Sequence, residues 1–139
     1  MSLEKLLHRL LVIISILTVL SGLTQMFFPD LVLRILSAQI TPTTTHFFAT
    51  VGMFMVGFGG VFLQSLLSAK PDPVVALWAA LQKFGASVLV ALGVAHGVFA
   101  WLALGVAGFD LVSGLLAILY WRKIAAGGGG LPGSADARS

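Results

Sequence analysis

The sequence predicts an all-α integral membrane protein, an antiparallel four-helix bundle with a short interfacial helix between its first and second spans. Of its 139 residues, 58% are hydrophobic and only 9% are charged, whereas an average soluble domain is about 25% charged. A helix of roughly 20 apolar residues crosses about 30 Å of hydrocarbon, and the chain has room for four such segments. Lipid must therefore be the solvent for much of its surface.

The first span follows a short charged segment that contains Lys5 and Arg9. Residues 10–29 carry no formal charge and end in Met-Phe-Phe-Pro, whereas a signal peptide has a shorter apolar core and a small-residue cleavage site. We therefore expect an uncleaved helix over about residues 8–29, which the pair Pro29-Asp30 would end.

The segment 31–40 is too short to span a membrane, but its apolar residues recur at helical spacing. This pattern predicts an interfacial helix that lies on the bilayer surface. Thr41 is a suitable N-cap and Pro42 suits a first helical turn, so the second span is expected at about residues 43–67. The polar sequence Lys-Pro-Asp-Pro at residues 70–73 separates it from the next span.

Residues 74–121 are long enough for two spans but not for three. Their only internal turn signal is His96-Gly97, which predicts helices at about 74–95 and 99–121 joined by a very short hairpin.

The four spans form one predicted transmembrane domain over residues 1–124. The Gly-rich segment 125–139 is expected to be a flexible cytoplasmic tail, because it offers little apolar surface to bury. The chain has no cysteine, which excludes disulfides and cysteine-ligated metal centres.

Cationic residues indicate the orientation, because cytoplasmic segments of membrane proteins carry an excess of Lys and Arg. If both termini are cytoplasmic, Arg34 is the only outer cation, and the inner ones are Lys5, Arg9, Lys70, Arg122, Lys123 and Arg138. These charges lie mainly at helix ends and form no basic patch. The expected partner is therefore the lipid bilayer and not a nucleic acid. Trp101 and the pair Tyr120-Trp121 are expected in the aromatic belts of the two interfaces.

Lys83 and Asp110 are the only formal charges in the apolar interiors of the four predicted spans. A charge near the bilayer centre costs roughly 2.5–3.5 kcal/mol on insertion scales. At about 1.5 Å per residue, Lys83 lies about 14 Å and Asp110 about 17 Å from the inner ends of their helices. We therefore predict that these two residues form an ion pair.

The predicted pair allows a structural and a functional interpretation. It could fix the register of the helices, or it could handle protons or anions together with Gln82, Ser87 and Ser113. A third possibility is that Lys83 extends toward the inner interface or meets a partner subunit.

Polar or small residues form a stripe on each span. The first span presents His8, Ser15, Thr18, Gly22 and Gln25 on roughly one face, and the second presents His46, Thr50, Met53, Gly57 and Gln64. Such stripes are typical of close helix packing with hydrogen bonds between helices. The alternative is a polar cavity for a ligand, with Thr18, Gln25, His46, Thr50 and Gln64 as candidate lining residues.

No cofactor is predicted, and the sequence contains no recognisable set of catalytic residues. His46 and His96 would lie at similar depths on different helices, which is the minimum for bis-imidazole ligation of haem b. We keep this as a subsidiary hypothesis and predict no other metal site.

Several segments resemble the DoxX-like group of small bacterial four-helix membrane proteins. They are the sequences Phe-Pro-Asp-Leu-Val-Leu-Arg-Ile-Leu at 28–36, His-Phe-Phe-Ala-Thr-Val-Gly-Met-Phe-Met at 46–55 with Gly59-Gly60, Trp-Ala-Ala-Leu-Gln-Lys-Phe-Gly at 78–85 and Phe-Asp-Leu-Val-Ser-Gly at 109–114. The resemblance spans residues 3–123 and implies an antiparallel four-helix bundle in the bacterial cytoplasmic membrane. Some members of the group are accessory subunits of quinone-dependent respiratory complexes.

Two functions follow as hypotheses. The first is a non-catalytic subunit or scaffold in a membrane complex that associates with itself or with partner membrane subunits through Gly-rich helix faces. The resemblance to the DoxX-like group suggests a respiratory complex. The second is a binder or transporter of a small lipophilic or anionic molecule, with Lys83 and Asp110 in its pocket.

Overall fold

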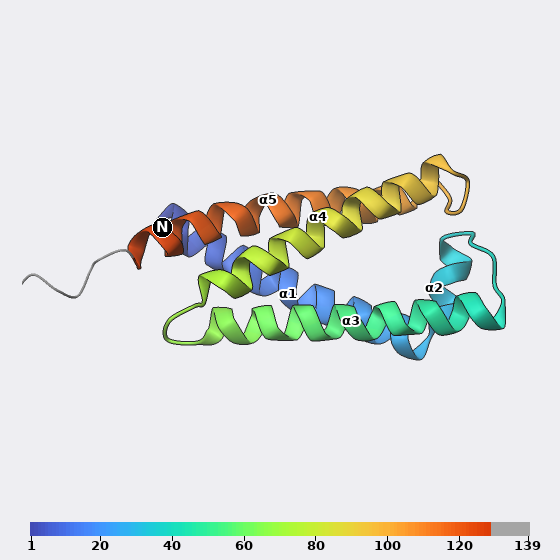
Figure 1. Ribbon diagram of the computed structural model, residues 1–139, viewed down its shortest axis with the longest axis horizontal. Coiled ribbons are helices and arrows are strands. Elements are labelled where there is room, and N and C mark those ends of the chain that lie inside the picture. Colours follow the sequence, from blue (N-terminus) through green and yellow to red (C-terminus); the bar gives the residue numbers. More distant parts are fainter. Residues whose placement is uncertain (129–139) are drawn as a thin grey trace, which may run out of the picture.

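The computed structural model describes residues 1–128, which form five α-helices and no strand (Figure 1). The helices are α1 (Leu3–Phe27), α2 (Pro29–Ile35), α3 (Pro42–Leu67), α4 (Pro73–Ala95) and α5 (Ala103–Gly127). All but α2 are long and apolar enough to cross a membrane. The prediction of an all-α chain with four candidate spans is therefore confirmed.

Helix α1 is shifted toward the N-terminus from the predicted range 8–29. It begins at Leu3 because the Ser2 side chain caps it, accepting a hydrogen bond from the Lys5 amide at 3.3 Å. It ends at Phe27 because Pro29 is the first residue of α2. A proline suits the first turn of a helix, where the backbone amide needs no partner within the helix.

Helix α2 occupies residues 29–35 of the segment in which a short interfacial helix was predicted at 31–40. It ends in a Schellman motif, in which the Ala38 amide donates to the Leu33 carbonyl and the Ser37 amide to the Arg34 carbonyl. This motif needs a left-handed residue, and Ser37 has a φ of 52°. The backbone turn therefore stops the helix five residues before the apolar pattern ends.

Helices α3 and α4 begin close to their predicted positions. Thr41 and Thr44 form a capping box at the start of α3, and Asp72 accepts a hydrogen bond from the Val74 amide at the start of α4. In both helices a proline occupies the first helical position.

The connection between α4 and α5 is longer than the predicted hairpin and covers residues 96–102. Gly97 adopts a φ of 71°, and the amides of Val98 and Phe99 turn back to the Gly93 carbonyl. Because this turn holds Phe99 outside the helix, α5 begins at Ala103 and not at residue 99.

Helix α5 also continues to Gly127, beyond the predicted end at residue 121 and into the predicted tail. Most of that tail, residues 129–139, lies outside the described part of the chain.

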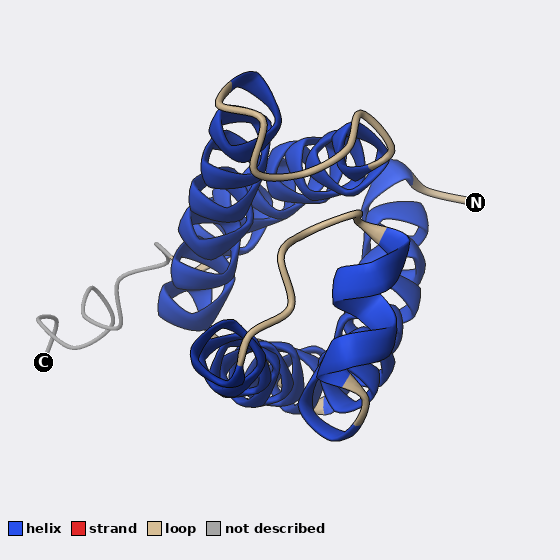
Figure 2. Ribbon diagram, turned by 90° about the vertical axis from the view of Figure 1, so that its right-hand side faces the viewer, coloured by secondary structure: helices blue, strands red, loops and turns tan. Residues whose placement is uncertain are grey.

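The four long helices pack mainly as two pairs, α1 with α3 and α4 with α5. Figure 1 shows the start of α1 and the end of α5 at the same end of the molecule, which we call the terminal end. In Figure 2, which looks from the opposite end, the near side carries α2 and the loop before α5. The Ala100 amide donates to the Leu36 carbonyl there at 2.8 Å, so that the two loop regions are joined.

The α1–α3 pair makes its closest contact at Gly22 and Gly52. A Cβ atom added to Gly52 would lie 2.7 Å from the Gly22 carbonyl oxygen and 2.7 Å from the Met26 amide nitrogen. Two helix backbones can approach to this distance only where both lack side chains, as is typical of glycine contacts in membranes.

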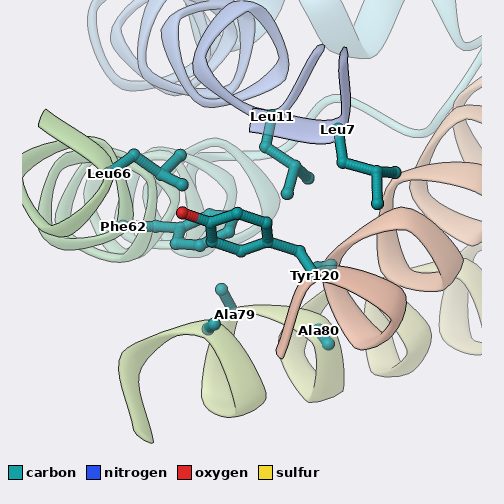
Figure 3. Packing of buried hydrophobic residues seen from close by; sticks show 9 residues of the cluster. Leu7, Leu11, Phe62, Leu66, Ala79, Ala80 and Tyr120 are labelled. Atoms are coloured by element: carbon teal, nitrogen blue, oxygen red, sulfur yellow. The ribbon is translucent and has the colours of Figure 1, made fainter. Parts of the chain in front are cut away.

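An apolar cluster joins the two pairs toward the terminal end (Figure 3). Leu7 and Leu11 of α1 meet Tyr120 of α5 in this cluster, next to alanines of α4. Its buried members are Leu7, Leu11, Phe62, Leu66, Ala76, Ala79, Ala80, Ala117 and Tyr120. The small residues of α4 let large side chains from three other helices fill the space between the pairs.

The close contact of α1 and α3 generates a test. We expect Gly52→Ala to lower the free energy of unfolding by about 1–3 kcal/mol, because the new methyl group meets backbone atoms that can move only if the helices separate. Reversible unfolding in mixtures of SDS and a mild detergent measures this change.

Gly85→Ala is the control, since it makes the same substitution inside a long helix at an exposed position where no atom lies within 4 Å of the added Cβ. Its stability should be unchanged or higher by up to about 1 kcal/mol, which reflects the helix propensity of alanine. If both variants lost the same free energy of unfolding, the Gly22–Gly52 contact would not determine how closely α1 and α3 pack.

Candidate functional site: a buried lysine between two helix pairs

Lys83 and Asp110 form a buried ion pair, with 2.8 Å between the Lys83 Nζ and the Asp110 Oδ1. Lys83 is 8% exposed and Asp110 is 7% exposed. The pair joins α4 to α5, at a level where Ser87 also donates to the Ala107 carbonyl across the same helix contact. The ion pair predicted from the depths of the two residues is therefore present.

Thr18 is a second partner of Lys83 and lies on α1. The Lys83 Nζ donates to the Thr18 Oγ1 at 2.9 Å, and the Thr18 hydroxyl in turn donates to the Ile14 carbonyl at 2.9 Å. The ring of Phe109 lies on another side of the ammonium group, 5.4 Å from its centroid to the Nζ, within the range of a cation–π interaction. Lys83 thus connects the α4–α5 pair to the α1–α3 pair.

A small cavity lies beside Lys83 and is lined by residues of all four long helices, among them Ser15, Thr18, Gln82 and Ser113. It offers only about 10 Å³ to the centre of a water-sized sphere. Roughly 10–15 Å³ is the space that one water molecule needs. A small-molecule site is far larger, roughly 300–1,000 Å³.

The other buried candidates also have polar partners. Ser113 donates to the Phe109 carbonyl within α5, and Gln25 donates to the Phe48 carbonyl and so bridges α1 and α3. The predicted stripe on the first span is confirmed at Ser15, Thr18, Gly22 and Gln25, which are all buried.

The predicted polar face of the second span does not point inward. His46 and Gln64 are exposed and Thr50 is half-buried, while Gly52, Gly59, Phe62 and Leu66 form the buried face of α3. Residues 57 and 64 each lie five positions after a buried glycine, Gly52 and Gly59. Five positions correspond to about 140° around a helix, so both residues point away from the buried face. The predicted polar face of this helix was wrong, because the glycine contact with α1, and not the polarity of the side chains, determines which face of α3 is buried.

The two candidate haem ligands, His46 and His96, are both exposed. His46 packs edge-on against the ring of the adjacent Phe47, and His96 is the C-cap of α4. Among residues 1–128, no group of three or more His, Cys, Asp or Glu side chains is placed to hold a metal ion.

The sequence interpretation missed the role of Tyr120, which it placed in an aromatic belt. Tyr120 is 3% exposed, and its hydroxyl lies 3.2 Å from the His8 Nδ1, where it joins α5 to α1. The burial of Tyr120 could have been predicted from the helical repeat. Tyr120 follows Ser113 by seven residues, which is about two turns, and so it shares the buried face of α5.

Comparisons with protein-family models, with curated proteins and with solved structures find no match to this chain. The resemblance to the DoxX-like group therefore rests on the sequence motifs alone and stays a prediction.

The partners of Lys83 predict a specific pattern of stabilities. Lys83→Met and Asp110→Asn should each lower the free energy of unfolding by about 3–5 kcal/mol, because each leaves one buried charge without its partner. The double variant Lys83→Met/Asp110→Asn should recover most of that loss, since it removes both charges. Reversible unfolding in SDS and mild detergent gives all three values.

Lys123→Met is the control for the loss of a lysine charge, because Lys123 is exposed near the end of α5. Its effect should stay within about 0.5 kcal/mol. If the double variant lost as much stability as the sum of the single variants, the two charges would not stabilise each other.

Proposed function

We propose that this chain is a multi-pass protein of the bacterial cytoplasmic membrane, with both termini in the cytoplasm. Its four long helices cross the bilayer as an antiparallel bundle, and it acts as a non-catalytic subunit or scaffold of a membrane complex. Of the eight Lys and Arg residues, Lys83 lies inside a span, and six of the other seven fall on the inner side in this orientation, in line with the positive-inside rule.

The exposed surface supports the location in a membrane. Large apolar side chains are exposed on every long helix, for example Leu20 on α1, Phe54 on α3, Leu89 on α4 and Val112 on α5. Soluble monomers rarely expose apolar patches larger than a few hundred Å². In a membrane, lipid chains would cover this surface and keep it out of water.

The proposed association with other helices rests on glycines that face outward. Gly57 and Gly60 on α3, and Gly105 and Gly108 on α5, have no atom within 4 Å of an added Cβ, so that packing inside the chain does not explain them. A glycine inside a helix costs about 1 kcal/mol relative to alanine. At a membrane-exposed position it allows a second helix to approach closely.

The interior favours this function over transport or ligand binding. Lys83 is already bonded to Asp110 and Thr18, and the cavity beside it has room for about one water molecule. A binder of lipophilic or anionic molecules would need the two helix pairs to separate at Lys83, which would break the hydrogen bond from Lys83 to Thr18.

Native mass spectrometry in a mild detergent tests the proposed association. We expect protein purified from its membrane to carry a second copy of the chain or a partner membrane protein. Gly57→Leu/Gly60→Leu and Gly105→Leu/Gly108→Leu fill the two glycine pairs, and at least one of them should abolish the complex. An absorption spectrum of the same sample checks for haem, whose Soret band would support ligation by His46 and His96.

Gly85→Leu is the control, because Gly85 is exposed on α4 and has no atom within 4 Å of an added Cβ, but has no second glycine one turn away. It should leave the complex intact. A monomeric, partner-free wild-type particle would contradict the proposal, as would loss of the complex in all three variants alike.

A further inference from the structure

Ser15 has the only buried side-chain oxygen without a hydrogen-bond partner among residues 1–128. The residue lies in the middle of α1 and is 2% exposed. Other hydroxyls in these helices return to the carbonyl four residues earlier, as Thr18, Thr24 and Ser113 do at 2.7–2.9 Å. The Leu11 carbonyl is the equivalent acceptor for Ser15, but no such bond is present. A buried hydroxyl without a partner costs about 1–3 kcal/mol, so the position of Ser15 calls for an explanation.

The Ser15 side chain lines the small cavity beside Lys83. It lies one helical turn before Thr18, the residue that accepts from Lys83, so both hydroxyls project from the same face of α1. The space of about 10 Å³ for a sphere centre is near the minimum for one water molecule.

Lys83 has one donor left for this cavity. A lysine ammonium group carries three N–H bonds, and two of them go to Asp110 and Thr18. The Phe109 ring attracts the charge but offers no lone pair. The cavity is therefore lined both by a lysine with one unused donor and by a serine whose hydroxyl has no partner.

We propose that a single internal water molecule occupies this cavity, where it accepts a hydrogen bond from the Lys83 Nζ and donates one to the Ser15 Oγ. Lys83 then has three acceptors, and Ser15 has the partner that it otherwise lacks. This hydration site does not depend on the function proposed above, since it follows from the interior of one chain.

The chemistry of the cavity selects water over other occupants. An anion would add a negative charge where Asp110 already balances Lys83, and a cation would face the ammonium group directly. An apolar ligand would leave both polar groups unsatisfied, and the space does not admit anything larger than water.

Solid-state NMR in lipid bilayers tests the proposal. With Lys5, Lys70 and Lys123 replaced by arginine, a protein labelled with ¹⁵N-lysine gives a side-chain signal from Lys83 alone. We expect magnetisation transfer from water protons to the Lys83 Nζ. The transfer should persist in the presence of a water-soluble paramagnetic agent, because the bound water is separated from bulk solvent. Absence of transfer in this protein would overturn the proposal.

Ser15→Val fills the cavity with a methyl group and removes the hydroxyl, so that most of the transfer should be lost. Thr24→Val is the matched control, because Thr24 is on the same helix but exposed, and its hydroxyl bonds within the helix. The transfer should be unchanged there. Equal transfer in wild type and in Ser15→Val would also overturn the proposal.

Crystals grown in a lipid mesophase give an independent test that needs no variant. The proposal requires a density peak at about 2.7–3.2 Å from both the Lys83 Nζ and the Ser15 Oγ. An empty cavity with the Ser15 hydroxyl turned to the Leu11 carbonyl would contradict it.

Discussion

The ammonium group of Lys83 lies where the two helix pairs meet, and its bonds to Asp110 and Thr18 connect three of the four long helices. Two other side chains among the described residues join the pairs near the terminal end: the His8 ring lies within hydrogen-bond distance of the Tyr120 hydroxyl, and the Ser65 hydroxyl of α3 accepts from the amide of Asp72, the N-cap of α4. A backbone bond from Ala100 to Leu36 connects the pairs at the opposite end. The seam between the pairs is therefore held near both ends and in the middle, and only the middle contact involves opposite charges.

Contacts within each pair have a different physical basis from contacts between the pairs. The α1–α3 contact depends on the absence of side chains, since Gly22 and Gly52 bring two backbones together. In the α4–α5 contact, Gly114 receives the ring of Phe84. Between the pairs, the large side chains Leu11 and Phe62 of the α1–α3 pair meet Tyr120 and the alanines of the α4–α5 pair. Lipid is as apolar as these side chains, so that shape and polar bonds, and not the hydrophobic effect, must select this arrangement.

Features that depend on composition and local patterns could be predicted from the sequence. The number of candidate spans follows from hydropathy, and the second and third spans were predicted to start at about residues 43 and 74, one residue after the observed starts at Pro42 and Pro73. The Lys83–Asp110 pair follows from depth. Features that depend on the contacting helix could not. The buried face of α3 is determined by Gly22 of α1, a residue thirty positions before Gly52, and no pattern within α3 identifies it. The partner Thr18 was recognised as a polar residue of the right helix face, but its bond to Lys83 depends on how the two pairs meet.

The energetics of the buried pair indicate what it contributes to the fold. A paired and hydrogen-bonded charge in an apolar interior adds little net stability, because its desolvation offsets most of the attraction. An unpaired charge at the same depth is strongly unfavourable. The pair therefore acts mainly by disfavouring other arrangements of α4 and α5, because any arrangement that separates Lys83 from Asp110 leaves two charges in an apolar environment. Apolar side chains penalise a shift in helix register only weakly in lipid. Because Thr18 extends the same constraint to α1, a single lysine restricts both the register of α4 on α5 and the position of that pair on α1.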